Sequence, residues 1–161
     1  MAAEPQVVEM TLESTLESVT AAEEVTTEVC SKAGFDEEEQ HRIEMAVHES
    51  MINAVSHGNK YDAHKRVRVR FQTYPDRLEI HIRDQGLGFD IGHVPNPLQA
   101  ENLLKVSGRG IFLIRSFVDE FRVERPEGNG TEVILVKRKN LKKNPDQGGK
   151  HREHEGENAP R

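Results

Sequence analysis

The sequence has little of several features that mark whole classes of protein. A single cysteine, Cys30, among 161 residues excludes an intramolecular disulfide and a cysteine-based zinc cluster, and it agrees with a reducing cytoplasm. No apolar run is long enough to span a membrane. Residues 1–10 lack the basic region and apolar core of a secretory signal. We therefore expect a soluble cytoplasmic protein without a membrane partner.

Positive charge is also scarce in the first part of the chain. The net charge of −6 argues against a general nucleic-acid binder. Residues 1–62 hold 14 Asp and Glu against 3 Lys and Arg, whereas residues 63–143 hold 16 Lys and Arg against 10 Asp and Glu. An acidic half beside a basic half suits an anionic ligand held between them, and it suits a self-complementary surface equally well.

Hydrophobic periodicity predicts one folded domain over residues 1–139 and a disordered polar tail over residues 140–161. Ser14 and Glu17 have the spacing of a capping box before a first helix, and Gly34 is expected to end that helix. Asp36 is expected to cap the second helix, which would end at residues 57–59. The predicted strands cover residues 6–12, 65–74, 78–83, 121–125 and 132–139, with a third helix opening at Ser107.

The second helix carries an unusual pair of stripes within EMAVHESMINAVSHGN, residues 44–59. Its apolar stripe has core spacing and consists of Ile43, Val47, Ser50, Met51 and Ala54. Glu49, Asn53 and His57 recur four residues apart on a second stripe that adjoins the first. Polar groups at the edge of an interior need partners. This stripe could cap neighbouring loops, or it could form a functional site.

The strand predicted over residues 65–74 alternates between two kinds of side chain. Val67, Val69 and Phe71 face one way, and an arginine ladder of Arg66, Arg68 and Arg70 faces the other. This alternation is typical of a half-buried antiparallel strand. We interpret the ladder as a solvated sheet face, with phosphate binding as the alternative.

Two glycine motifs follow this hairpin. Asp84 ends a strand and precedes Gly86-x-Gly88, and a Ser107-Gly108-Arg109-Gly110 segment opens a helix. A glycine-rich turn into a helix N-terminus presents free N–H groups that suit a phosphate. A plain loop followed by a helix cap would have the same sequence pattern. Residues 91–107, between the motifs, lack periodicity and contain prolines, which favours a lid.

The three motifs, followed by Thr131 after a glycine-rich turn, together resemble the GHKL (Bergerat) ATP-binding fold. Within that fold, ESMINAVSHGN, DQGLGFD and GRGIFLIRSFVD are most similar to the stand-alone anti-sigma factor serine/threonine kinases. The resemblance covers residues 6–138. It implies an α/β (α+β) two-layer sandwich, with helices packed on one face of a mixed, mostly antiparallel sheet.

The resemblance also implies roles for single residues. Asn53 would ligate Mg²⁺, and Glu49 would be the general base, the one catalytic residue. Asp84 would accept a hydrogen bond from the adenine amino group, with Thr131 supporting that edge. The other positions expected to contact ATP are His57, Gly86, Gly88, Ser107, Gly108, Arg109 and Gly110. An amide oxygen for a metal, a carboxylate for a base and glycines for phosphates suffice chemically for phosphoryl transfer.

Members of this family sequester a sigma factor and phosphorylate a Ser or Thr of a small STAS-type antagonist protein, usually as homodimers. The resemblance therefore implies a cytoplasmic anti-sigma kinase that uses ATP and Mg²⁺. Two alternatives stay open. The chain could be a binding module that holds nucleotide without phosphate transfer, or an ATP-binding output fragment of a split sensor kinase.

Overall fold

The computed structural model describes residues 4–86, 108–126 and 130–140. The lid expected over residues 91–107 and the tail beyond Asn140 lie outside these residues. Both remain predictions.

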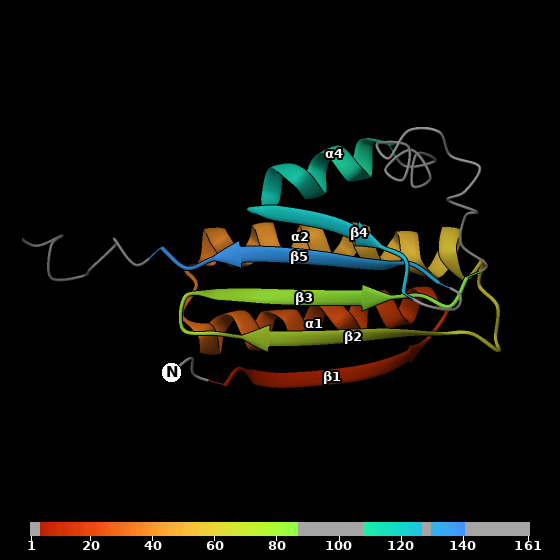
Figure 1. Cartoon of the computed structure of the whole chain (residues 1–161), viewed down its shortest axis with the longest axis horizontal. Helices are drawn as coiled ribbons and strands as arrows, with labels where there is room; N and C mark the ends of the chain where they lie inside the picture. Colours follow the sequence, from red (N-terminus) through yellow and green to blue (C-terminus); the bar gives the residue numbers. More distant parts are fainter. Residues whose placement is uncertain (1–3, 87–107, 127–129, 141–161) are drawn as a thin grey trace, which may run out of the picture.

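Five strands form one sheet in the order β1-β2-β3-β5-β4 (Figure 1). Each neighbouring pair is antiparallel, so no parallel pair occurs among the described strands of a sheet that was expected to be mixed. The alternation of the arginine ladder sets the register, because Val69 and Phe71 pair with Ile82 and Ile80 on the buried side. The strands are β1 (Gln6–Glu13), β2 (Arg66–Thr73), β3 (Arg77–Arg83), β4 (Glu120–Glu124) and β5 (Glu132–Arg138).

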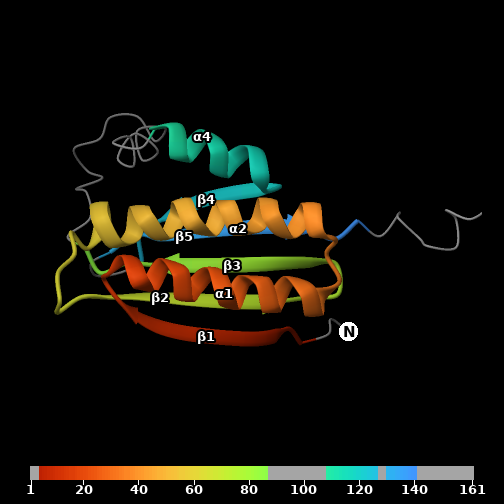
Figure 2. The same ribbon diagram turned by 180° about the vertical axis from the view of Figure 1, so that it is seen from behind.

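The helices lie on one side of this sheet (Figures 1 and 2). Helices α1 (Leu16–Ala33) and α2 (Glu37–Ile52) run side by side over it, and α4 (Gly108–Phe117) packs against α2. A π-helical turn, η1 (Asn53–Gly58), continues α2. None of the described helices has the length and apolarity required to cross a bilayer. The expected two-layer sandwich is therefore confirmed.

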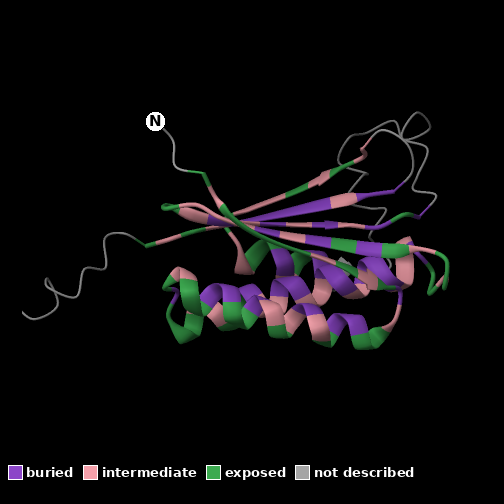
Figure 3. Cartoon of the chain, turned by 90° about the horizontal axis from the view of Figure 1, so that it is seen from below, coloured by how far each residue is buried: buried purple, intermediate pink, exposed green. Residues whose placement is uncertain are grey.

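The core fills the space between the two layers (Figure 3). All five residues of the predicted apolar stripe on the second helix are buried, as are the inward-facing positions of β2 and β3. Cys30 of α1 is buried in the same core, and desolvation raises the pKa of its thiol to about 12. Its thiol is therefore a neutral packing group at physiological pH.

The helix ends confirm two predictions and correct one. Gly34 ends α1 with a φ of +92°, and Asp36 caps α2 by accepting from the N–H of Glu39 at 2.8 Å. The expected capping box of Ser14 is wrong, because Thr15 is the N-cap of α1. Ser14 is buried and donates instead to the carbonyl of Lys65, so a long-range bond replaces the local one.

Candidate functional site

Asp84 occupies the end of β3, where that strand reaches the same end of the molecule as η1 (Figure 1). Its side chain is 6% exposed, and Oδ1 accepts from the N–H groups of Gly86 at 3.0 Å and Thr131 at 3.1 Å. The N–H of Asp84 in turn donates to the Thr131 carbonyl at 3.0 Å. These bonds fix the carboxyl group, and no described residue donates to Oδ2. One oxygen thus holds the side chain in place, and the other keeps its capacity to accept a hydrogen bond.

Two opposing influences act on the pKa of the Asp84 carboxyl group. Burial is the largest influence and raises the pKa of this carboxyl above its ordinary value, while the N–H groups of Gly86 and Thr131 oppose that rise. Asp84 has no salt-bridge partner in the part of the chain that the structure describes, and a buried carboxyl group without one is costly for the fold. Perturbed acids of this kind gather at functional sites.

Three glycines pack against Asp84 with no room for a side chain. A Cβ at Gly58 would lie 2.2 Å from Asp84 Oδ2, and one at Gly86 would lie 2.1 Å from the Gly58 carbonyl oxygen. Gly130 has a φ of +109°, and a Cβ there would lie 2.2 Å from the Asp84 carbonyl oxygen. The end of η1, the segment after β3 and the start of β5 therefore meet backbone to backbone around one carboxyl group.

Asn59 holds these segments together from behind. It is fully buried, and its Nδ2 donates to Ser14 Oγ at 2.8 Å and to the Arg66 carbonyl at 3.0 Å. Its Oδ1 accepts from the N–H of Gln85 at 2.7 Å. One amide therefore uses both its donor and its acceptor to join the chain before α1, the start of β2 and the segment beside Asp84.

The π-helical turn changes how the polar stripe is presented. The N–H of Asn59 donates to the carbonyl of Ala54 at 2.8 Å, an i to i+5 bond that widens the last turn. Glu49 and Asn53 keep α-helical spacing, and the N–H of Asn53 donates to the Glu49 carbonyl. The expectation that His57 stacks on them at the same spacing is wrong, because His57 lies inside η1. The widened turn instead places Gly58, its last residue, against the side chain of Asp84.

The two polar residues of the stripe differ in burial. Glu49 is half-buried, whereas the side chain of Asn53 is 3% exposed at the start of η1. The turn that begins at Asn53 ends at Gly58, beside the Asp84 carboxyl group. The chain therefore leads from Glu49 in α2 through Asn53 and the rest of η1 to Gly58, which lies beside Asp84 after β3.

The third motif opens α4, which begins at Gly108. Gly110 is buried, and Ile111 and Ile114 form the buried side of the helix as expected. This helix packs against α2, the helix that carries Glu49. Gly88 and Ser107 lie outside the described residues.

A metal cage built from protein alone is absent in the part of the chain that the structure describes. No group of three or more His, Cys, Asp or Glu side chains there could hold a metal ion. The amide oxygen of Asn53 is a hard donor that fits Mg²⁺, which takes few protein ligands and shares phosphate oxygens. A metal at this site would therefore depend on a bound phosphate group.

Three residues of this site were missed in the sequence: Gly58, Asn59 and Gly130. Gly58 and Asn59 were interpreted as a helix stop and Gly130 as part of a turn. Their roles depend on contacts with residues 84 and 85, which lie more than twenty positions away. A Gly-Asn pair directly after a polar helical stripe was the one local signal.

Comparisons with known proteins agree with this geometry. The family model of the histidine kinase-like ATPase domain matches residues 12–137. The chain is 37% identical over 106 residues to the serine-protein kinase RsbW of Bacillus licheniformis and 32% identical over 106 residues to that of Bacillus subtilis. Each of these matches covers 62% of this chain and 66% of the relative. The RsbW of Halalkalibacterium halodurans is 30% identical over 141 residues, 83% of this chain and 84% of the relative.

A solved structure shows the same fold. The RsbU and RsbW domains of a Mycobacterium tuberculosis protein superpose with a TM-score of 0.58 at 17% identity, over 83% of this chain and 32% of that one. The family match spans all the described elements from α1 to β5 and most of the Asp84 site. The chain therefore belongs to the histidine kinase-like ATPase domain family.

Proposed function

We propose that this chain is an ATP-dependent serine/threonine kinase that sequesters a sigma factor and phosphorylates a small antagonist protein of that factor. Asp84 carries the proposal. A buried carboxyl group with one oxygen fixed by two N–H groups and the other without a donor among the described residues suits the exocyclic amino group of adenine. Similarity to the RsbW serine-protein kinases supports the transfer of phosphate to a hydroxyl group.

In this proposal, each polar residue on the path from α2 has its own task. Asn53 holds Mg²⁺ through its amide oxygen, together with phosphate oxygens of the nucleotide. Glu49 accepts the proton of the attacking hydroxyl group. Thr131 supports the adenine edge through its N–H, which donates to Asp84 Oδ1, and its carbonyl, which accepts from the Asp84 N–H. His57 lines the nucleotide from the widened turn.

The phosphates are held by backbone in this proposal. The positive end of α4 and its glycine-rich start would attract the anionic groups, and the glycines after β3 would let backbone approach the nucleotide. These positions are Gly86, Gly88, Ser107, Gly108, Arg109 and Gly110. Bound Mg²⁺ would neutralise charge that builds up during transfer.

We further propose that the protein acts in the cytoplasm as a homodimer. The acidic first half and the basic second half of the chain offer complementary surfaces for a second copy. Sedimentation equilibrium tests this directly, and a single species of 18.3 kDa at micromolar concentration would contradict the dimer.

Adenine selectivity tests the proposal for Asp84. Calorimetric titration should detect ATP binding with Mg²⁺ and much weaker binding of GTP, which carries a carbonyl where adenine carries the amino group. Asp84→Asn turns Oδ2 into a potential donor and should weaken ATP binding at least about tenfold, the scale of one charge-assisted hydrogen bond.

The fold should tolerate Asp84→Asn, because the amide oxygen can still accept from Gly86 and Thr131 and the buried charge is gone. We expect a free energy of unfolding within about 1 kcal/mol of the parent. If the folded variant bound ATP and GTP as the parent does, Asp84 would not read adenine.

A further inference from the structure

The sheet face that the helices leave uncovered carries many arginines, and most of them are paired with acids. Arg70 pairs with Glu9 at 3.3 Å, and Arg77 pairs with Glu79 at 2.8 Å. Arg122 of β4 lies 3.2 Å from Glu120. Over most of this face, cations and carboxylates therefore alternate, as on an ordinary solvated surface.

Arg68 and Arg83 break this pattern. They are directly opposite each other in the β2–β3 register, and neither forms an ion pair or side-chain hydrogen bond with any residue in the described ranges. Like charges at opposed positions of a sheet are destabilising. Arg77 and Arg138 are also opposed, in the β3–β5 register, but each of them pairs with a carboxylate. Arg68 and Arg83 are opposed without such a partner among the described residues.

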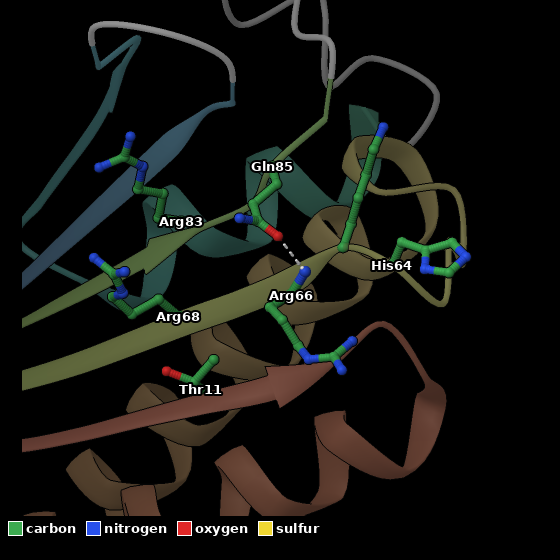
Figure 4. Close-up of a pocket in the computed structure, with 7 residues that line it drawn as sticks. Thr11, His64, Arg66, Arg68, Arg83 and Gln85 are labelled. Carbon is green, nitrogen blue, oxygen red and sulfur yellow. Dashed lines mark hydrogen bonds between the residues drawn. The ribbon is translucent and has the colours of Figure 1, made fainter.

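This arginine pair borders a pocket on the uncovered face, which we call the basic pocket (Figure 4). Its volume is about 510 Å³, within the usual range of sites for small molecules. Three adjacent strands contribute to its floor, and none of the described residues that line it is acidic. The lining includes Thr11 of β1, Arg68 of β2, Arg83 of β3, and His64, Lys65 and Arg66 before and at the start of β2.

We propose that the basic pocket binds a small anion that carries two or more phosphate groups. Four permanent cations around one cavity exceed what a single carboxylate would neutralise. Guanidinium groups bind phosphate oxygens through paired donors, and Thr11 adds a hydroxyl donor. A bound anion would also relieve the repulsion between Arg68 and Arg83. A cavity of this volume favours a small molecule over an extended protein surface.

The basic pocket is separate from the proposed nucleotide site. Successive residues of a strand point to opposite faces, so Arg83 faces the uncovered side while the next residue, Asp84, faces Gly58 of η1. Gln85 joins the two regions, because its Oε1 accepts from the N–H of Arg66 and its own N–H donates to Asn59. The two sites therefore share a short segment and no ligand-facing side chain.

Inorganic pyrophosphate is the probe for this proposal. Calorimetric titration at low ionic strength should show binding that is at least about fivefold tighter than binding of inorganic phosphate. Arg68→Gln and Arg83→Gln should each weaken it about tenfold. Arg122→Gln, which removes an acid-paired cation from the same face, should change it less than about twofold.

A stability measurement separates a ligand site from a structural one. Without ligand, Arg68→Gln should melt at the same or a slightly higher temperature than the parent, because repulsion is removed. Pyrophosphate should raise the melting temperature of the parent and not that of Arg68→Gln. The variant comparison does not depend on ATP binding, so the two proposals can fail separately.

Three outcomes would overturn the proposal. The parent could fail to bind pyrophosphate at low ionic strength. Arg68→Gln and Arg83→Gln could bind it as tightly as the parent does. Alternatively, both variants could lose affinity for a polyglutamate peptide while pyrophosphate affinity is unchanged, which would make the face a surface for an acidic protein.

Discussion

At the scale of single residues, Asp84 shows how a costly group can be retained. Burial raises the pKa of its carboxyl, and the surrounding N–H groups only partly compensate. The chain could have placed a neutral side chain there at lower cost. Instead, three glycines bring backbone against it, so the local structure is built around this carboxyl group.

The glycine at the end of η1 offers a direct test of that arrangement. Gly58→Ala places a methyl group 2.2 Å from Asp84 Oδ2, so either the carboxyl group or the turn must move. We expect a loss of about 1–3 kcal/mol in the free energy of unfolding, as in other overpacked sites. ATP affinity measured by calorimetry should fall at least about tenfold.

Gly34→Ala is the matched control for this change. Gly34 also requires a glycine, because its φ is +92°, yet nothing lies within 4 Å of the added Cβ. It should destabilise by about 1 kcal/mol and leave ATP affinity unchanged. Equal ATP affinity in the parent and Gly58→Ala would mean that this close contact does not shape the site.

At the scale of elements, one buried amide joins the pieces that form the site. Asn59→Ala removes two donated bonds and one accepted bond, and it leaves the N–H of Gln85 and the carbonyl of Arg66 without this partner. We expect a loss of about 2–4 kcal/mol, from about 1–3 kcal/mol for each buried group left unsatisfied. Urea unfolding measures it.

Asp36→Ala shows how much stability is lost when an ordinary local helix cap is removed. Its carboxylate caps α2 at the opposite end of that helix, and the change should lower stability by about 1 kcal/mol. If Asn59→Ala were no more destabilising than Asp36→Ala, the amide would not be the main link between these elements.

Periodicity was sufficient to predict the elements. The apolar stripe of the second helix and the alternation of β2 and β3 each report a local geometry that burial enforces, so these elements and their core faces are confirmed. The boundary at Ser14 was wrong because Ser14 and Thr15 are equivalent caps locally. Only the distant contacts with Lys65 and Asn59 distinguish them.

The site was less predictable than the elements. Asp84, Gly86 and Thr131 were expected together, and the structure brings them together. The π-helical turn was not foreseen, because no local pattern in NAVSHG distinguishes a π-helical turn from an α-helical one. Its widened geometry follows from where Gly58 and Asn59 must reach, and that depends on the fold as a whole.

At the scale of the whole molecule, the sheet separates two kinds of chemistry. The covered face packs against the helices, and Asp84 lies at one edge of it, directly after β3. The uncovered face carries ion pairs and the basic pocket. Ile134 and Val136 of β5 are buried even though their register partners His81 and Glu79 belong to that uncovered face. The stems of the charged side chains on that face therefore shield these two apolar residues from water, while the charged groups themselves stay in contact with it.

The proposed kinase activity requires the whole assembly of helix, metal and nucleotide, and Glu49 and Asn53 should fail in different ways. Asn53→Ala should lose both Mg²⁺-dependent ATP affinity and turnover, because it removes a metal ligand. Glu49→Gln keeps shape and hydrogen bonding but not basicity. It should retain ATP affinity while phosphate transfer falls by roughly 10²–10⁴-fold.

The most direct measurement is transfer of radiolabelled phosphate from ATP to a candidate antagonist protein by the parent and both variants, beside calorimetric ATP titrations of each. The account predicts transfer by the parent, a defect in chemistry alone for Glu49→Gln, and a defect in binding and chemistry for Asn53→Ala. Equal losses of ATP affinity in the two variants would contradict the assigned roles by making Glu49 a metal ligand. Phosphate transfer by Glu49→Gln at the parent's rate would contradict the claim that Glu49 is the general base.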